Sequence, residues 1–182
     1  IVGVIYCGLY IDGFDRFITV GTEHLSRECK DKIDEDGCIL SRNPEELLEI
    51  FMHLVWVAHG LHDADWTPSQ AHIEAINSIA PVLRHLRHAD GNLCRFNGSF
   101  LKYPGELDRY LFLSGNKKKT TEILRMGYAR MEGGRTSIIQ DAGRLPNIPY
   151  SNLAHASVLG FELTHGRQPL IVNCGSGVNF GR

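Results

Sequence analysis

The sequence predicts a chain in two parts, a helical part followed by an antiparallel β part. Two strong helix-start signals, at Asn43 and at Thr67, each lead into a largely apolar run. From about residue 123 apolar side chains recur at every second position, which is typical of strands. The polar run GNKKK at 115–119 lies between the two patterns. We therefore expect a helical domain over residues 1–118 and a β domain over residues 119–182.

The helical part is predicted to contain long helices at residues 14–33, 43–60 and 67–87, and a short one at 104–113. Asn43 suits an N-cap, because its side-chain oxygen can accept an orphan backbone N–H, and Pro44 suits the first helical position. The helix after it is apolar nearly all round, so it needs neighbours on several faces. Pro81 is expected to kink or break its helix. Helices joined by short polar turns are found in bundles, solenoids and toroids.

The β part is predicted to contain a hairpin at residues 123–140 and a second at 159–172, after a small hairpin or extended segment at 88–98. In the second hairpin, Leu159, Phe161 and Leu163 alternate with smaller or polar residues, and His165-Gly166 reverses the chain. This alternation indicates a half-buried strand. A single hairpin cannot bury its apolar face alone, so we expect it to pair with more sheet.

Composition places the chain among globular proteins, since 43% of its 182 residues are hydrophobic and 22% are charged. The formal net charge of −2 gives no basic field that would favour nucleic acid. We interpret the cationic run at 117–119 as a solvated loop. The five cysteines contain no CxxC pair, which excludes the usual redox and zinc-ribbon motifs and favours buried thiols.

The first residues are apolar, but residues 1–11 are too short to cross a bilayer. The sequence begins with Ile1 and not with Met, and we interpret the chain as an internal fragment of a longer protein. A fragment leaves apolar faces uncovered. We therefore expect exposed hydrophobic surface on the helix of residues 44–60 and on the sheet.

Several polar residues are candidates for chemistry. The pairs His59/His62 and His85/His88 have the spacing of helical metal ligands, but no third ligand follows from the spacing, and histidines at helix ends explain them as well. Helix capping accounts for the presence of Asn43 but not for that of Arg42. The guanidinium of Arg42 can form a bidentate interaction with a carboxylate or sulfate. His155 stands before a strand, where it can be a general base, a metal ligand or a core histidine.

Three segments resemble the heparinase II/III-like family. Residues 155–163 (HASVLGFEL) and 169–175 (PLIVNCG) are similar to the family patterns HADxLSFEL and PLLVDPG. Residues 36–44 (DGCILSRNP) are similar to the DGGHxSRNP segment of a bacterial branch. Residues 87–98, which begin RHADG and end FNG, are similar to its RHGDG…FNG segment. The order and spacing agree over roughly residues 30–175.

This resemblance implies the end of an (α/α) toroid domain followed by the first strands of an antiparallel β-sandwich. It also implies a lyase that cleaves uronic-acid-containing polysaccharide by β-elimination, in a cleft between the two domains. Arg42 and Asn43 would then neutralise the uronate carboxylate, and His155 would be the catalytic histidine. His88, Asp90 and Asn97 would line the cleft and bind substrate.

Some positions depart from the family pattern. Leu153 stands where many members have a second histidine, and Asn173 replaces an acidic residue that binds metal in some members. An amide is a poor zinc ligand, so we expect no metal or other cofactor. The expected partner is an acidic polysaccharide, with no nucleic acid and no membrane span, and no oligomeric state is predicted. The resemblance implies a bacterial protein of the periplasm or cell envelope. The alternative is a non-catalytic protein of the same fold that binds carbohydrate or handles an envelope polymer.

Overall fold

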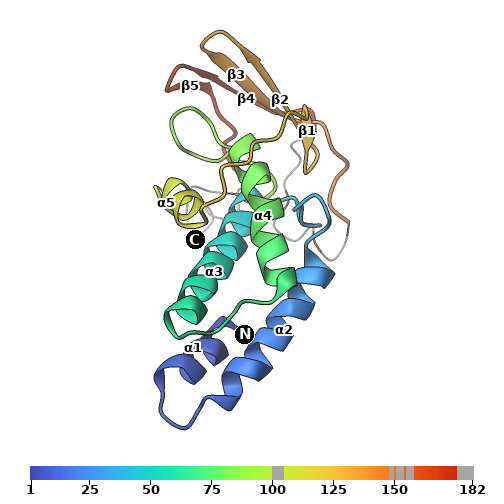
Figure 1. Ribbon diagram of the computed structural model, residues 1–182. Coiled ribbons are helices and arrows are strands. Elements are labelled where there is room, and N and C mark those ends of the chain that lie inside the picture. Colours follow the sequence, from blue (N-terminus) through green and yellow to red (C-terminus); the bar gives the residue numbers. More distant parts are fainter. Residues whose placement is uncertain (100–104, 148–149, 151–153, 155–157, 176–182) are drawn as a thin grey trace, which may run out of the picture.

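The computed structural model describes residues 1–99, 105–147, 150, 154 and 158–175. Five helices come first in the described chain and five strands follow, so the predicted change from helices to an antiparallel sheet is confirmed. Figure 1 shows the sheet stacked on one end of the helical part. The last helix ends at Leu113 and the first strand begins at Leu124. A domain division at residue 118 stays a prediction.

The predicted helices are present as α2 (Arg16–Lys32), α3 (Pro44–Asp63), α4 (Gln70–His85) and α5 (Glu106–Leu113). A further helix, α1 (Val2–Tyr10), was not predicted from the short apolar N-terminal run. α4 continues through Pro81, where a kink or break was expected. In the described part of the chain, no helix has the length and apolar character that a bilayer crossing requires.

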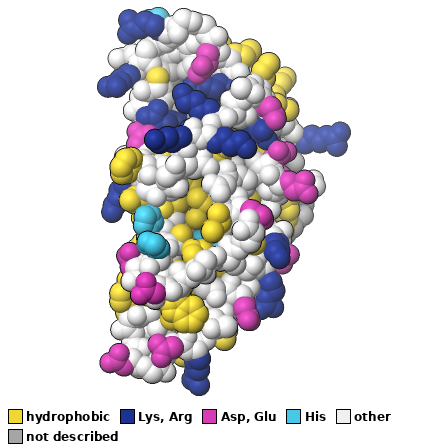
Figure 2. Space-filling view, viewed as in Figure 1, with side chains coloured by type: hydrophobic (Ala, Val, Ile, Leu, Met, Phe, Trp, Pro, Cys, Tyr) yellow, Lys and Arg dark blue, Asp and Glu magenta, His cyan; other side chains and the backbone are white. Residues whose placement is uncertain are grey.

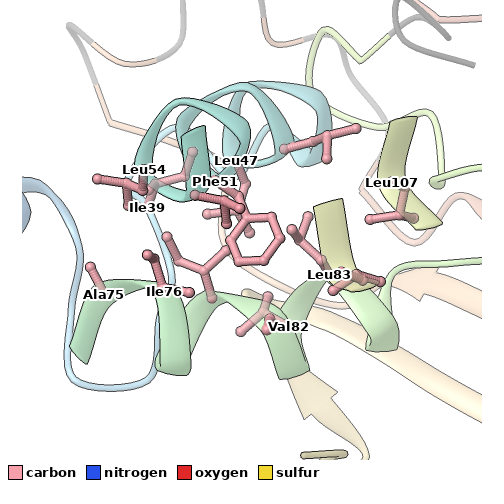
Figure 3. Packing of buried hydrophobic residues seen from close by; sticks show 14 of the residues in the cluster. Ile39, Leu47, Phe51, Leu54, Ala75, Ile76, Val82, Leu83 and Leu107 are labelled. Carbon is pink, nitrogen blue, oxygen red and sulfur yellow. The ribbon is translucent and has the colours of Figure 1, made fainter. Parts of the chain in front are cut away.

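The helical core is built around α3, as its apolar circumference predicts. Figure 3 shows Phe51 of α3 pointing toward Val82 and Leu83 of α4, with Leu107 of α5 beside them. All four side chains are buried. Burying a large apolar side chain stabilises the fold by about 1.5–3 kcal/mol. α3 and α4 therefore hold the helical part together, and α1 and α2 pack around them.

The start of α3 agrees with its sequence signal, whereas the start of α4 does not. Asn43 Oδ1 accepts hydrogen bonds from the backbone N–H groups of Glu45 and Glu46, at 2.9 and 3.2 Å. At α4 the N-cap is Ser69, whose hydroxyl accepts from His72 N. The helix therefore begins after Ser69 and not at Thr67, because the serine provides the cap closest to the apolar stripe.

The sheet is an antiparallel meander with the strands in sequence order: β1 (Leu124–Arg125), β2 (Tyr128–Gly133), β3 (Thr136–Asp141), β4 (Phe161–His165) and β5 (Gln168–Ile171). The predicted first hairpin contains an extra reversal at Met126 and Gly127, both with positive φ. This reversal divides the predicted strand into β1 and β2. The second hairpin forms as predicted, with its turn at Gly166.

One face of β4 is polar and the other is apolar, and the polar face is the one that packs against the helical part. Glu162 is 2% exposed and Thr164 is equally buried, whereas Phe161 is 43% exposed. The alternation in sequence predicts the strand correctly but does not say which face is inside. The expected exposed hydrophobic surface is confirmed on the sheet, and also on α3, where Trp56 is 51% exposed.

Gly37 marks a point where the loop before α3 touches α4. Its φ is +77°, and a Cβ placed there would lie 2.2 Å from the carbonyl oxygen of Ser78. Backbone atoms cannot move aside as a flexible side chain can. We expect Gly37→Ala to lower the free energy of unfolding by more than about 2 kcal/mol, since the left-handed backbone and the clash both cost energy.

Gly134→Ala is the matched control for this prediction, because its φ is +60° and nothing lies within 4 Å of the added carbon. This variant therefore measures the cost of the backbone conformation alone, about 1–2 kcal/mol. Urea denaturation of both variants makes the comparison. Equal decreases in the free energy of unfolding of the two variants would show that the loop at Gly37 shifts enough to avoid the clash.

Candidate functional site

Arg42 joins the helical part to the sheet. Its guanidinium donates hydrogen bonds to three backbone carbonyls, those of Met126 (2.9 Å), Gly127 (3.0 Å) and Arg144 (2.5 Å), and forms an ion pair with Asp141. Asp141 is fully buried, at the end of β3. The sequence predicts that Arg42 binds a carboxylate. In the structure it binds one that belongs to the chain itself.

The backbone around Arg42 is shaped to receive the guanidinium. A Cβ on Gly127 or on Gly143 would lie 2.6 Å from guanidinium atoms, so both positions need glycine. Arg42 itself has a φ of +53°, which is uncommon for a residue with a side chain. A strained backbone at a buried arginine whose guanidinium makes four hydrogen bonds indicates that the surrounding contacts hold it in place.

Tyr128 and Asn97 extend this cluster. The Tyr128 ring lies under the guanidinium, 4.8 Å from centroid to Cζ, and its hydroxyl donates to the carbonyl of Arg42 at 2.6 Å. Asn97 Nδ2 donates to the same hydroxyl at 2.6 Å. Burial, the main cause, raises the pKa of Tyr128 far above its usual range, with Cys94 adding to the shift. The fully buried ring and the two hydrogen bonds of the hydroxyl indicate a structural role for Tyr128.

His88 makes a second polar contact between helices and sheet. Its Nε2 lies 2.7 Å from Glu162 Oε2, and its Nδ1 lies 3.0 Å from the Thr164 hydroxyl. The other Glu162 oxygen accepts hydrogen bonds from the backbone N–H groups of Arg95 and Asn173. Glu162 and Thr164, on the buried face of β4, thus provide the polar partners of His88, which follows α4.

The remaining predicted residues have local roles. Asn43 caps α3, and Asp90 accepts from the backbone and side-chain nitrogens of Asn92 in a turn. The side chain of Asn173 accepts from Gly175 N. His155 lies outside the described residues, as does Leu153. No finding tests the functional roles assigned to these residues, and they stay predictions.

A cleft opens beside Arg42, between the loop that precedes α3 and the segment that follows β3. Its volume is about 470 Å³, and it is lined by three arginines (Arg42, Arg125 and Arg144) together with Asn147 and Tyr150. The Arg125 guanidinium is bonded to Asp36 and Glu122. Arg144 is exposed and makes no ion pair with any described residue. Among the described lining residues, Arg144 is thus the arginine without a carboxylate partner and Tyr150 provides an exposed phenol, while Asp34 adds a further acid.

Metal ligation finds no support in the described ranges, where no three His, Cys, Asp or Glu side chains come together in a way that could hold an ion. His59 Nε2 lies 3.1 Å from the carbonyl of Leu113, and His85 Nε2 lies 3.0 Å from that of Tyr128. These contacts agree with the interpretation of the histidine pairs as structural groups at helix ends.

The sequence did not point to Asp141, Glu162 or Thr164 as partners of Arg42 and His88. A signal was present in β4, where Glu162 and Thr164 alternate with Phe161 and Leu163, whereas β3 is mostly polar and gave none for Asp141. Such a residue faces either solvent or a buried partner. Polar residues on a strand point to a buried partner only when an arginine or a histidine elsewhere in the chain requires a buried acceptor, as Arg42 and His88 do here.

Comparisons with known proteins place this chain beside one family. The model of the heparinase II/III-like C-terminal region matches residues 116–182. FtsZ-localized protein C of Caulobacter vibrioides is 27% identical over 141 residues, which are 77% of this chain and 24% of that protein. The resemblance inferred from the sequence is confirmed by the family match and by solved structures.

The solved structures share the fold at low identity. A heparinase III structure has a TM-score of 0.76 at 14% identity, over 96% of this chain and 33% of that one. The heparan sulfate lyase HepC of Pedobacter heparinus has a TM-score of 0.70 at 13% identity, over 94% of this chain and 31% of that one. This chain spans about a third of these structures and about a quarter of the curated relative.

Proposed function

Because residues 116–182 carry the C-terminal region of the heparinase II/III-like proteins, we propose that the chain is part of a polysaccharide lyase. Its substrate is a uronic-acid-containing polysaccharide, and its reaction is β-elimination. One observation supports this most: the family-like segment 36–44 reaches the sheet through Arg42, and beside that contact lies a cleft with an exposed tyrosine and an arginine that has no described carboxylate partner.

β-Elimination removes the C5 proton of a uronate, forms a C4–C5 double bond and expels the oxygen at C4, which takes up a proton. A cation beside the uronate carboxylate makes the C5 proton more acidic. Arg144 is the residue we propose for this task, because it is exposed in the cleft and has no described carboxylate partner. A base must take the C5 proton and an acid must supply one to the leaving oxygen. We propose His155 as the base and Tyr150 as the acid.

The residues at the junction then hold the cleft in shape. Arg42 binds the carbonyl of Arg144 at 2.5 Å, so it positions the backbone that carries the proposed substrate ligand. Asn43 fixes the start of α3, directly after Arg42. His88, Asp90 and Asn97 are proposed to act in the same way, by keeping the turn after α4 against the sheet.

A non-catalytic polysaccharide-binding protein of the same fold is the second candidate. Two observations favour it. The Arg42 guanidinium, assigned by resemblance to the uronate, is occupied by Asp141 and three carbonyls. Asn173 stands where some family members have a metal-binding acid, and its side chain serves a turn.

The test uses the full-length protein with a panel of unsulfated and sulfated uronate polymers. We expect the ultraviolet absorbance of an unsaturated uronate to increase with time. Arg144→Ala should lower kcat/KM by about 10²-fold, the size of loss found when a charge-stabilising group is removed. Arg167→Ala is the matched control, since Arg167 is exposed in the β4–β5 turn and does not line the cleft.

Binding without any unsaturated product would establish the second candidate instead. Neither binding nor product, with every polymer of the panel, would refute both. Product formation that is equally sensitive to Arg144→Ala and Arg167→Ala would keep the lyase assignment but remove Arg144 from the site.

A further inference from the structure

A second hollow lies next to the cleft, near the start of β1. Its volume is about 690 Å³, and it lies between the end of α4, α5, the segment before β1, and β2. Glu122 lines both the hollow and the cleft, so the two spaces are neighbours. Volumes of 300–1,000 Å³ are usual for ligand sites. Figure 2 shows Lys and Arg side chains gathered in a band between the sheet and the helices.

Four cations line this hollow: Arg84, Arg87, Lys119 and Arg130. Three acids line it as well. Asp108 pairs with Arg87 at 2.8 Å and Glu132 pairs with Arg130 at 2.6 Å. The third, Glu122, pairs with Arg125, which does not line this hollow. Within the described chain, Arg84 and Lys119 therefore have no carboxylate partner, and the hollow has an excess of positive charge.

The backbone of the lysine run is hydrogen-bonded to α4, whereas the sequence predicts only a solvated loop. The three lysine residues themselves are exposed. Arg84 Nη1 donates to the carbonyl of Lys118 at 3.0 Å, and Arg84 Nη2 donates to that of Asn116. Asn116 Nδ2 donates to Asn77 Oδ1 at 2.9 Å, and Asn116 Oδ1 accepts from Lys118 N at 2.8 Å. These bonds hold the backbone of the run in one place. Less conformational entropy is then lost when its ammonium groups bind a ligand.

We propose that this hollow is an accessory subsite for the acidic polysaccharide, in which Lys119 binds a carboxylate or sulfate group several sugars away from the reacting bond and Arg84 holds the backbone that carries Lys119. The inference rests on the proposed function, because it assigns a further part of the same chain-like ligand. The ligand that fits is extended and anionic, since the hollow is open, carries an excess of positive charge and lies next to the cleft, with which it shares Glu122. Thr120 and Thr121 also line the hollow, and their hydroxyl groups can hydrogen-bond to the hydroxyl groups of a sugar.

Charge reversal at two neighbouring lysines tests the subsite. Lys119→Glu and Lys117→Glu change the net charge of the protein equally, but only Lys119 lines the hollow. In the full-length protein, we expect Lys119→Glu to weaken binding of a uronate hexasaccharide about fivefold or more, and Lys117→Glu to change it less than about twofold. Calorimetry with unsulfated, sulfated and neutral hexasaccharides gives the three affinities.

Oligosaccharide length provides the second measurement. Binding of a uronate disaccharide should be the same in wild type and Lys119→Glu, because two sugars fill only the cleft. The loss for the hexasaccharide should shrink as salt is added, since exposed charges are screened. A larger loss with the sulfated than with the unsulfated hexasaccharide would assign the subsite to sulfate, and the reverse would assign it to carboxylate.

Two results would overturn the subsite. Equal losses in Lys119→Glu and Lys117→Glu would show a general field effect, and equal losses for short and long oligosaccharides would place Lys119 in the cleft. In both cases wild-type binding and product formation persist, so the proposed function stands. A wild-type protein that neither binds nor cleaves any acidic oligosaccharide would instead end the proposed function, and the subsite with it.

Discussion

Arg42→Ala is expected to lower the free energy of unfolding by about 3–5 kcal/mol, the loss usually found when one partner of a buried ion pair is removed. The substitution leaves Asp141, which is fully buried, without its cation. It also leaves the carbonyls of Met126, Gly127 and Arg144 without their donor. Urea denaturation followed by circular dichroism measures the change.

Arg144→Ala is the control for this result, because it removes the same type of side chain from an exposed position and should cost less than about 0.5 kcal/mol. Combining Arg42→Ala with Asp141→Leu should recover part of the loss, since the double variant no longer buries a carboxylate that has lost its guanidinium. An Arg42→Ala protein of near wild-type stability that forms no product would show that Arg42 acts on the substrate, as the family resemblance implies.

His88→Ala should destabilise the protein by about 1–3 kcal/mol, because Glu162 then remains buried without its hydrogen bond to the imidazole. Glu162 still accepts two backbone hydrogen bonds, so Glu162→Gln should cost less than His88→Ala. His62→Ala is the control, since His62 is exposed on the last turn of α3.

Hydrogen exchange locates the effect of His88→Ala. We expect amide protection to decrease first in β4, where Glu162 and Thr164 face His88, and to remain highest in α3. A variant that loses protection evenly through helices and sheet would mean that His88 supports the whole fold and not the junction. A loss below about 1 kcal/mol would mean that water replaces the imidazole at Glu162.

The elements with local signals were predictable from the sequence. Asn43 and Pro44 marked the start of α3, and its apolar circumference placed it at the centre of the helical core. The alternation around Phe161 gave β4 and its turn. These features depend on residues a few positions apart, so periodicity and capping rules apply directly to them.

The junction was not predictable in this way, because its pairs join residues far apart in the chain. Arg42 and Asp141 are 99 positions apart, and His88 and Glu162 are 74 positions apart. Asn43 alone accounts for the cap of α3, so the sequence predicts that Arg42 binds a carboxylate or sulfate of a ligand. Only the structure shows that the inward face of the sheet supplies the carboxylate that this arginine needs.

The glycine cradle around Arg42 has a consequence for how this chain can change during evolution. Gly127 and Gly143 can gain a side chain only after the guanidinium has gone and the local backbone has shifted, because Gly127 has a φ of +77° and a Cβ on Gly143 would lie 2.8 Å from Gly127 Cα. The guanidinium is dispensable only after Asp141 has lost its charge. These four positions are distant in sequence but constrain one another through a few ångströms of space. A viable descendant therefore keeps all four residues or replaces them in a fixed order, with the carboxylate first.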